Sequence, residues 1–572
     1  MKHKFKPLFC LFLAFSFNFL SVAQSGRTPV RAENGMVVTS HYLASEVGRD
    51  ILAKGGNAID ASVATAFALA VTLPSAGNLG GGGFLVYHGS NGDKTSFNFR
   101  EKAPLASTPN MFLGKDGKIK DNSNHEGLLS VGVPGTVAGL YDAHQKMGSL
   151  PWQELLQPAI ELAENGFEST YNMNWFLNWV KDKKDDALYA ATAKTFLKNG
   201  EEVYKPGETW KQPDLAKTLK RIQKNGADGF YKGKTAKLIA DFMKKHGGLI
   251  TEEDLAKYKA EELEPVTGTY RGHEIVAMPP PSSGGVALIE MLNILEGFNL
   301  EETGHNSAAS LHLLTEAMRR AYADRALYLG DPNFNPEMPI EKIISKKYAA
   351  ELREGIEIKK ASISDSANFN NAHLQYESPQ TTHISVVDNE GNAVSLTYTL
   401  ERSYGSKIVV EGAGFLLNNE MGDFNPIPGH TDTRGLIGTE PNLVAPEKRM
   451  LSSMTPTIVA KDGKPLLVIG SPGGRTIINT VLQVIVNTID HKMNVAEAIE
   501  SPRIHHQWLP NRTRFEDWGI SPDTKRIYEE MGHEVYEAGN QGQAMGIYID
   551  WENNLIYGAA DSRSYDGKAS GF

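Results

Sequence analysis

The sequence predicts a soluble protein that combines α-helices with β-strands. Three observations support this prediction. The composition is globular, with 41% hydrophobic and 22% charged residues, which is too apolar for a disordered chain. Apolar residues recur at helical spacing through much of residues 41–354. Short runs rich in β-branched residues and bounded by turn residues occur within this region and after it.

The helices are predicted from apolar periodicity and from their end signals. The first spans residues 41–54 and stops at Gly55-Gly56. The second follows Asn57, a preferred N-cap residue, and spans residues 58–71. Further helical patterns cover residues 136–147, 152–164, 213–225, 233–246, 285–297, 306–328, 341–354, 477–490 and 522–531. The middle of the chain is therefore expected to be mostly helical.

The strands are predicted mainly as pairs around turn residues. Strands at 84–87 and 95–99 flank Asn91-Gly92, which indicates a hairpin. A second pair, 383–387 and 393–399, flanks a turn at 388–392. Single strands are expected at 457–460, 466–469 and 545–549. The polar stretch 361–380 has no period and predicts an exposed loop.

The net charge and the first residues limit the class and the compartment. The net charge is -10, which argues against a nucleic-acid-binding protein. A basic head, an apolar run at 8–20 and small residues at 21–23 have the layout of a secretory signal peptide. A membrane span needs ~20 apolar residues, so residues 1–23 predict export without a stable membrane anchor. The single cysteine, Cys10, lies in this segment, so the mature chain would have no disulfide.

Two glycine-rich runs are candidates for anion binding. Gly80–Gly83 lacks the strand-GxGxxG-helix context of a dinucleotide site, and 471–476 lacks the Walker spacing. Both runs predict tight turns. The backbone N–H groups of Gly473-Gly474 could also point together at an anion or a developing oxyanion. There is no HExxH or GxSxG motif, and His505-His506 is isolated, so we assign neither a metal nor a Ser-His-Asp triad.

Thr381 is by itself only a β-branched residue at the start of a strand. The uninterrupted run from Thr381 to Gly405, however, resembles the signature of the gamma-glutamyltranspeptidases, also called glutathione hydrolases. The resemblance extends over nearly the whole mature chain. Further matching runs are Asn78–Phe84, Phe99–Glu101 with Ala103-Pro104, Pro280–Gly285, Asn418–Met421, Leu451–Met454 and Gly470–Gly474.

The resemblance implies an α+β fold of the N-terminal-nucleophile hydrolase type, a four-layer αββα sandwich. Such proteins cut their own precursor, here between Gln380 and Thr381. The fragments would be a large subunit, residues 24–380, and a small subunit, residues 381–572, held as a heterodimer in one αββα unit. The Thr381 hydroxyl would attack the Gln380 carbonyl. The freed α-amino group, with a pKa near ~8, would then be the general base.

The resemblance also implies a role for each site residue. Thr399 matches the partner of the nucleophile, and Gly473 and Gly474 match the oxyanion hole. Arg100 matches the clamp for the substrate α-carboxylate. Ser452 and Ser453 match its hydroxyl partners, and Glu420, Asp423 and Glu401 match the acceptors of the α-ammonium group. No cofactor is implied.

Two features of this chain vary within the family. Position 401 is Glu here, so three carboxylates would face one ammonium group, and we predict that at least one has a raised pKa. Residues 428–448 are long enough to form a lid over the pocket. Several lidded relatives have an aromatic residue where this chain has Arg434.

The expected activity is transfer of the γ-glutamyl group of glutathione and other γ-glutamyl compounds to water, amino acids or dipeptides. The protein would be periplasmic or secreted. One alternative is a related acylase acting on glutaryl or cephalosporin side chains, whose substrate lacks the α-ammonium group. Two others are an unprocessed, non-catalytic binding protein and a nucleotide-binding protein that uses Gly80–Gly83.

Overall fold

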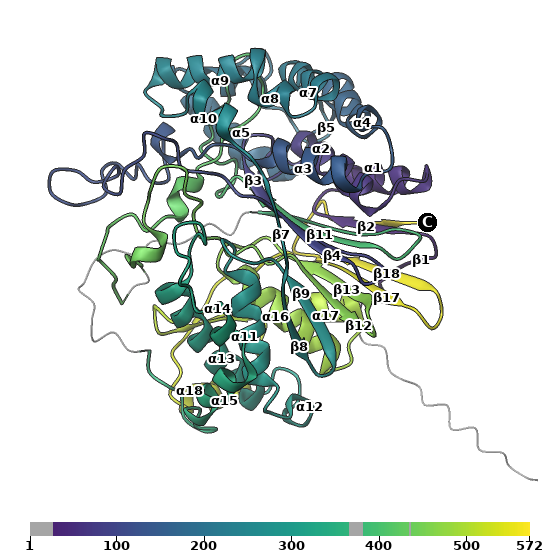
Figure 1. The fold of residues 1–572 in the computed structure, drawn as a ribbon, viewed down its shortest axis with the longest axis vertical. Coiled ribbons are helices and arrows are strands. Elements are labelled where there is room, and N and C mark those ends of the chain that lie inside the picture. The colour runs from purple at the N-terminus through teal and green to yellow at the C-terminus, as the bar shows by residue number, and fades with distance from the viewer. Residues whose placement is uncertain (1–26, 365–380, 434–435) are drawn as a thin grey trace, which may run out of the picture.

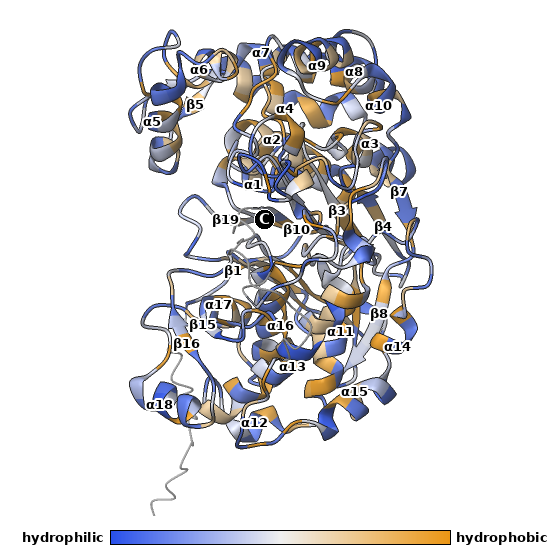
Figure 2. Cartoon of the chain, turned by 90° about the vertical axis from the view of Figure 1, so that its left-hand side faces the viewer, coloured by the Kyte–Doolittle hydropathy of each residue, from blue (hydrophilic) through white to orange (hydrophobic). Residues whose placement is uncertain are grey.

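The computed structural model describes residues 27–364, 381–433 and 436–572. Within these ranges, two seven-stranded antiparallel sheets lie face to face between two groups of helices (Figure 1). Figure 2 shows the same layers from the side, with the helices above and below the sheets. This arrangement confirms the predicted four-layer αββα sandwich. The predicted signal peptide with Cys10, the cleavage residue Gln380 and Arg434 lie outside the described residues.

The two sheets contain strands from both ends of the chain. The upper sheet runs in the order β19 (Lys568–Gly571), β2 (Met36–Thr39), β10 (Thr382–Val387), β11 (Ala393–Thr399), β3 (Gly82–His88), β4 (Lys94–Phe99) and β7 (Glu261–Leu263). The lower sheet runs in the order β1 (Val30–Ala32), β18 (Leu555–Ala560), β17 (Met545–Asp550), β13 (Lys464–Gly470), β12 (Thr457–Lys461), β9 (His273–Ala277) and β8 (Val266–Tyr270). Smaller sheets pair β5 (Phe167–Glu168) with β6 (Thr209–Trp210), and join β14 (Ile504–His505), β15 (Thr513–Phe515) and β16 (Val535–Glu537).

The helices divide between the two outer layers by their order in the chain (Figure 1). The upper layer contains α1 (Tyr42–Ala53), α2 (Ala58–Thr72), α3 (Thr136–Met147), α4 (Trp152–Asn165), α5 (Asn174–Lys183), α6 (Ala190–Phe196), α7 (Pro213–Asn225), α8 (Asp228–Tyr231), α9 (Gly233–His246) and α10 (Glu252–Lys257). The lower layer contains α11 (Gly284–Leu295), α12 (Leu300–Thr303), α13 (Ala308–Tyr328), α14 (Ile340–Ile343), α15 (Lys346–Glu354), α16 (Thr476–Ile489), α17 (Val495–Glu500) and α18 (Pro522–Glu530). No helix in the described part of the chain is long and apolar enough to cross a bilayer.

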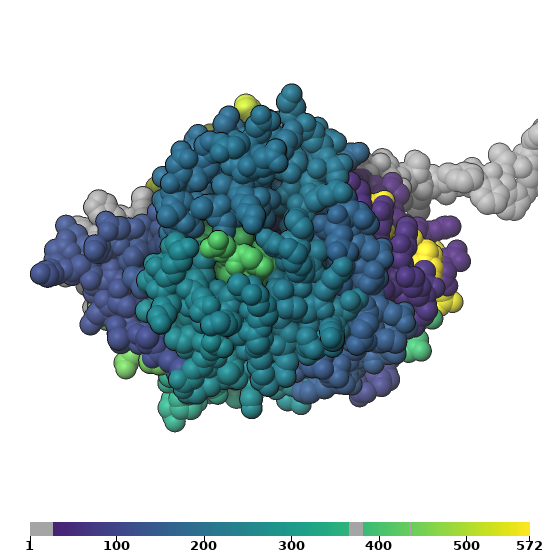
Figure 3. All heavy atoms as spheres, turned by 90° about the horizontal axis from the view of Figure 1, so that it is seen from above, coloured from purple at the N-terminus to yellow at the C-terminus, as the bar shows by residue number. Residues whose placement is uncertain are grey.

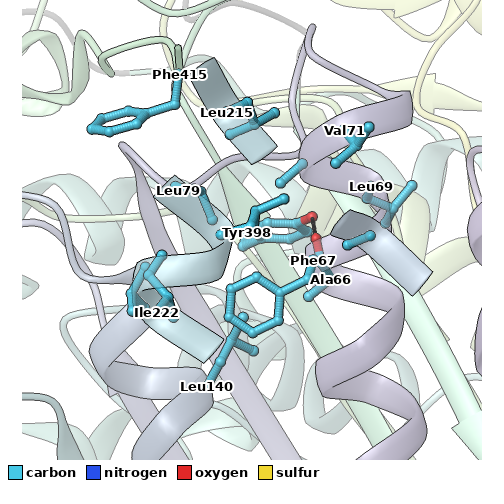
Figure 4. Packing of buried hydrophobic residues seen from close by; sticks show 14 of the residues in the cluster. Ala66, Phe67, Leu69, Val71, Leu79, Leu140, Leu215, Ile222, Tyr398 and Phe415 are labelled. Carbon is cyan, nitrogen blue, oxygen red and sulfur yellow. Dashed lines mark hydrogen bonds between the residues drawn. The ribbon is translucent and has the colours of Figure 1, made fainter. Parts of the chain in front are cut away.

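The upper core lies between α2 and the outer face of the upper sheet (Figure 4). Helix α2 is buried along its whole length, which explains its alanine-rich sequence. Its start is fixed by a capping box between Asn57 and Asp60. Tyr398 of β11 extends into this core, and its hydroxyl donates to the Ala66 carbonyl at 2.9 Å. The core therefore ties β11 to α2 on the sheet that carries Thr381.

Polar side chains of β10 and β11 join the two sheets through backbone carbonyls. The Ser385 hydroxyl donates to the Met545 carbonyl at 2.9 Å, and the Ser395 hydroxyl donates to the Ile469 carbonyl at 3.1 Å. His383 lies fully buried beside them, with its ring bonded to Thr397 at 2.8 Å. These bonds tie the paired strands β10 and β11 to the lower sheet.

Several buried histidines predict that acid destabilises the fold. Burial lowers the pKa of His383 and His533 to about 3, and that of His41 and His305 to about 4. Below pH 6.5 the unfolded chain binds protons that the folded chain does not, so each group removes roughly 1.4 kcal/mol per pH unit until its folded-state pKa is reached. We expect the melting temperature, measured by calorimetry, to fall steeply between pH 6.5 and pH 4.

The control for this effect is His305→Gln, which removes one titrating group. Its melting temperature should depend less on pH over the same window. Equal pH dependence of His305→Gln and the natural protein would show that this histidine does not contribute.

Most predicted elements are confirmed, and each difference has a physical cause. The helix predicted at 341–354 is two helices, because Ser345 breaks the first and caps α15 through the Tyr348 N–H. The hairpin of β8 and β9 interrupts the region expected to be mostly helical. Its short strands carry no long apolar run, and the edge strands β1 and β19 and the neighbouring β2 are also short. Their place in the sheets depends on partners far away in the sequence.

The predicted turn at Gly80–Gly83 is wrong, because Gly82 and Gly83 begin strand β3. A Cβ atom on Gly81 would lie 2.0 Å from the Thr399 carbonyl oxygen, and one on Gly83 would lie 2.4 Å from the Thr397 carbonyl oxygen. The glycines therefore permit close packing of backbone against β11. This packing leaves no phosphate cradle on that side and removes the structural basis of the nucleotide-binding alternative.

The segment after β11 passes through the helical layer formed by earlier residues. Figure 3 shows green residues of this segment at the surface, among the teal and blue residues of the earlier part of the chain. Glu411 pairs there with Lys245 of α9 at 3.4 Å. The two predicted fragments are thus interlocked through the upper layer as well as through shared sheets.

Candidate active site

The predicted nucleophile lies at the start of β10, an interior strand of the upper sheet. Thr381 directly precedes β10 and is only 8% exposed. Its hydroxyl donates to the Thr399 hydroxyl oxygen at 3.2 Å. Antiparallel pairing of β10 with β11 brings these two residues together. The Thr399 oxygen also accepts the Glu401 N–H at 2.9 Å, which fixes its position.

The predicted oxyanion pair forms a turn between β13 and α16. Gly473 has a φ of 143° and Gly474 has a φ of 57°, conformations that favour glycine. Their carbonyls accept N–H groups from Thr476 and Ile477 in the first turn of α16. Neither glycine N–H donates to another residue in the part of the chain that the structure describes. The turn prediction is confirmed here.

A pocket of about 290 Å³ brings the predicted site residues together. All six predicted binding residues line it, and of the predicted catalytic residues only Gly473 does not. The complete lining is Arg100, Thr381, Thr399, Glu401, Glu420, Asp423, Ser452, Ser453, Met454, Gly474 and Ile477. The lining therefore combines one cation, three carboxylates and four hydroxyls around the nucleophile.

Arg100 is the centre of a buried charge network. It follows β4, is fully buried, and its two terminal nitrogens donate to Glu420 and Asp423. Glu101 lies 3.7 Å away and is also buried, so this pair is not at the surface. The single positive charge of the arginine offsets part of the negative charge of these carboxylates, which lowers the cost of burying them. The predicted carboxylate clamp and ammonium acceptors are thus in direct contact.

Glu401 is held apart from this network by other partners. Its φ of 78° is unusual for a side chain larger than glycine. His125 approaches its carboxylate at 3.2 Å, and Arg402 approaches it at 3.5 Å. His125 was not singled out from the sequence, because no motif surrounds it. The third carboxylate lines the pocket but pairs with histidine and arginine on its own side.

The pKa of Glu420 is raised well above its usual range, chiefly by burial. Arg100 opposes this shift, while Glu101, Asp423 and Glu401 add to it as like charges. Burial also raises the pKa of Glu101. The predicted raised pKa is confirmed in direction. Its main cause is loss of hydration, and like-charge repulsion contributes less.

Arg325 supports the two pocket serines from behind. This buried residue of α13 donates to the Ser453 hydroxyl at 2.8 Å and to the Ser283 hydroxyl at 2.8 Å. Ser283 in turn donates its N–H to the Ser452 carbonyl at 2.8 Å. The arginine therefore fixes the loop of Ser452 and Ser453. Sequence reasoning missed it, because a lone basic residue in a helix carries no signal.

The candidate lid borders the pocket on the Asp423 side. Leu436 and Ile437 line a neighbouring cavity of about 570 Å³ that also contacts Asp423 and Arg475. Among the described residues, one group could ligate a metal, and it lies outside the pocket: His312, Glu316 and His533. Its two rings form a hydrogen bond with each other at 2.8 Å, and Glu316 pairs with Arg320.

Comparison with known proteins agrees with the fold and the pocket. A sequence model of the family Gamma-glutamyltranspeptidase matches residues 44–571. The chain therefore belongs to the gamma-glutamyltranspeptidase family. It is 46% identical to a glutathione hydrolase proenzyme of Escherichia coli (strain K12), over 95% of this chain and 93% of that one.

Two further comparisons cover almost the full length of this chain. A glutathione hydrolase proenzyme of Pseudomonas sp. (strain A14) is 45% identical over 98% of both chains. The crystal structure of a cephalosporin acylase from Bacillus halodurans superposes with a TM-score of 0.83 at 28% identity, covering 98% of this chain and 99% of that one. The fold is thus shared between glutathione hydrolases and an acylase.

Proposed function

We propose that this chain is an exported, self-cleaving gamma-glutamyltransferase and glutathione hydrolase. As a member of its family the chain is an enzyme. The observation that carries the proposal is the position of the Thr381 hydroxyl. It donates a hydrogen bond to Thr399 and lies in a pocket lined by a buried cation and buried carboxylates. Such a pocket matches a γ-glutamyl group, whose far end carries an α-carboxylate and an α-ammonium.

The first reaction would be cleavage of the chain itself. The Thr381 hydroxyl oxygen attacks the Gln380 carbonyl carbon, and the peptide nitrogen leaves as the α-amino group of Thr381. Water then hydrolyses the resulting ester and regenerates the hydroxyl. The cut would give subunits 24–380 and 381–572, and the shared sheets and the passage of the chain through the upper layer would hold them together.

The second reaction would transfer the γ-glutamyl group. The α-amino group takes the Thr381 hydroxyl proton as the oxygen attacks the γ-carbonyl carbon. The N–H groups of Gly473 and Gly474 would stabilise the oxyanion. The proton then passes to the leaving amine, which is Cys-Gly when glutathione is the donor. Water or an acceptor amine would cleave the acyl-enzyme ester by the same route in reverse.

Substrate binding would replace the two ion pairs of Arg100 with Glu420 and Asp423 by ion pairs to the substrate. The α-carboxylate takes the donors of Arg100 and the hydroxyls of Ser452 and Ser453. The α-ammonium takes Glu420 and Asp423, which pair with Arg100 in the structure. The network is pre-organised for a zwitterion because its positive and negative groups are already buried next to one another. A substrate with only one of the two charges would leave a partner uncompensated.

The rival activity is that of an acylase. A glutaryl amide lacks the α-ammonium group, so it would leave the carboxylates of Glu420 and Asp423 without a cation. The test supplies purified enzyme with glutathione, with and without glycylglycine, and separately with a glutaryl amide. We expect release of glutamate and Cys-Gly, formation of γ-glutamyl-glycylglycine, and at least about 100-fold slower turnover of the glutaryl amide. Faster turnover of the glutaryl amide would establish the acylase instead.

Donor binding is expected to weaken as the pH falls. A carboxyl with a raised pKa is protonated before an ordinary one, and once neutral it no longer attracts the ammonium. The KM for a γ-glutamyl donor should therefore rise on acidification, with a midpoint above the usual carboxyl range of about 4 to 4.5. A steady-state pH series of KM measures it.

Glu101→Gln sharpens this test because Glu101 raises the pKa of Glu420. Removing that negative charge should lower the midpoint of the KM profile. A KM that is constant between pH 5 and pH 8 would contradict the assignment of buried carboxylates to the ammonium.

A further inference from the structure

A second cavity lies against Thr381, outside the pocket described above. It encloses about 900 Å³, part of it open to solvent. Thr381 is the one described residue that lines both spaces. The acyl chain of a substrate fills the first pocket when its carbonyl carbon sits at the Thr381 hydroxyl. The amine on that same carbon then has the second cavity to extend into.

The walls of this cavity come from both predicted subunits. The loop after α2 (Leu73–Ala76) and the turn of Thr170–Met173 form one side. Tyr404 and the segment Ser564–Asp566 form the other. Tyr404 stacks on Phe176 at 3.6 Å and meets Trp175 edge-on at 5.5 Å, which makes a rigid aromatic wall. The space is therefore a built cleft that exists only where the two subunits meet.

Asp566 sets the charge of this cavity. Among the described residues that line it, Asp566 is the one charged side chain, and no lysine or arginine is present. The Asn172 amide donates to its carboxylate at 2.6 Å, which holds the charge in place across the subunit boundary. The cavity on the Asp423 side differs in charge, since two arginines, Arg325 and Arg475, line it. Thr381 does not line that cavity.

We propose that this second cavity holds the leaving amine and the acceptor amine, and that Asp566 favours amines without a carboxylate. The inference rests on the proposed transferase function and adds the class of acceptor. The acceptor nitrogen attacks the ester carbon on Thr381, a C–N bond forms, and the C–O bond to Thr381 breaks. The amine proton passes through the α-amino group to the released hydroxyl oxygen. A carboxylate on the acceptor is repelled by the negative charge of Asp566, whereas a neutral or cationic group is not repelled.

The experiment uses purified, processed enzyme with a γ-glutamyl anilide donor. It compares two acceptors that differ only in the terminal charge, glycylglycine and glycylglycinamide. We expect kcat/KM for transfer to be about five-fold higher for the amide, a typical effect of one partly screened charge pair. Asp566→Asn should bring the ratio close to one. Asp517→Asn removes an exposed carboxylate elsewhere and should keep the natural ratio.

A second variant tests the location independently of charge. Ser403→Phe places a large side chain in the cavity and should lower transfer to both acceptors relative to hydrolysis of the same donor. N-terminal analysis showing a start at Thr381 establishes that this variant has folded and cut itself.

Two results would overturn the inference while the proposed function stands. One is that Asp566→Asn leaves the kcat/KM ratio of the two acceptors unchanged and Ser403→Phe leaves the ratio of transfer to hydrolysis unchanged. The other is a ratio that responds to Arg475→Gln and not to Asp566→Asn, which would locate the acceptor in the cavity beside Asp423. Natural enzyme that neither hydrolyses the donor nor cuts itself would overturn the function and the inference together, before any acceptor is compared.

Discussion

Thr381→Ala is expected to remain one uncut chain and to lose all measurable transfer and hydrolysis. The substitution removes the oxygen that attacks Gln380, so the α-amino group is never freed. It also removes the oxygen that would carry the γ-glutamyl group. Losing a nucleophile and its base together costs on the order of 10⁴-fold or more in kcat. Denaturing electrophoresis and a glutathione hydrolysis assay measure the two effects.

Two neighbouring substitutions are the controls for this prediction. Thr381→Ser keeps the hydroxyl and should still cut itself, although more slowly. Thr382→Ser alters the next residue, whose hydroxyl bonds to Ser40 and not to Thr399. It should cut and turn over normally. A Thr381→Ala protein that still cuts itself, or still hydrolyses glutathione, would refute the mechanism.

Arg100→Lys is expected to raise the donor KM by about 100-fold, because one or two charge-assisted hydrogen bonds to the substrate are lost. Lysine keeps the charge but cannot contact Glu420 and Asp423 in the same forked geometry. It also leaves buried carboxylates poorly paired, so stability should fall by about 3 kcal/mol. Steady-state kinetics and thermal melting measure the two consequences separately.

Arg449→Lys is the matched control for the binding effect. Arg449 is equally buried and its side chain reaches the Arg100 carbonyl, but it pairs with Glu261 and does not line the pocket. It should lower the melting temperature and leave the donor KM within about two-fold. A similar rise in KM for both variants would mean that packing alone explains the result for Arg100.

The long helices and the central strands could be predicted because their signals are local. Asn57 caps α2, and the turn at 388–392 joins β10 to β11. The run from Thr381 to Gly405 was also sufficient to identify the family. The positions of the pocket residues followed from matching motifs, since Arg100 and Glu420 are 320 positions apart in the chain.

The rest depends on contacts that no single segment encodes. Strand β8 owes its place to β9, and β1 and β19 owe theirs to strands from the opposite end of the chain. Arg325 acts through the loop of Ser452 and Ser453, so its role appears only when α13 packs behind that loop. The direct pairing of Arg100 with both carboxylates likewise required the folded arrangement. The glycines at 80–83 were misread because close packing and tight turns favour the same residue.

N-terminal sequencing of the purified protein shows directly whether the chain cuts itself before Thr381. We expect two sequences in equal amounts, one beginning near Gln24 and the other beginning Thr381-Thr382-His383. The first would report removal of the signal peptide, and the second would report the self-cleavage that frees the catalytic amino group. A single sequence, with no start at Thr381 in protein that hydrolyses glutathione, would contradict it.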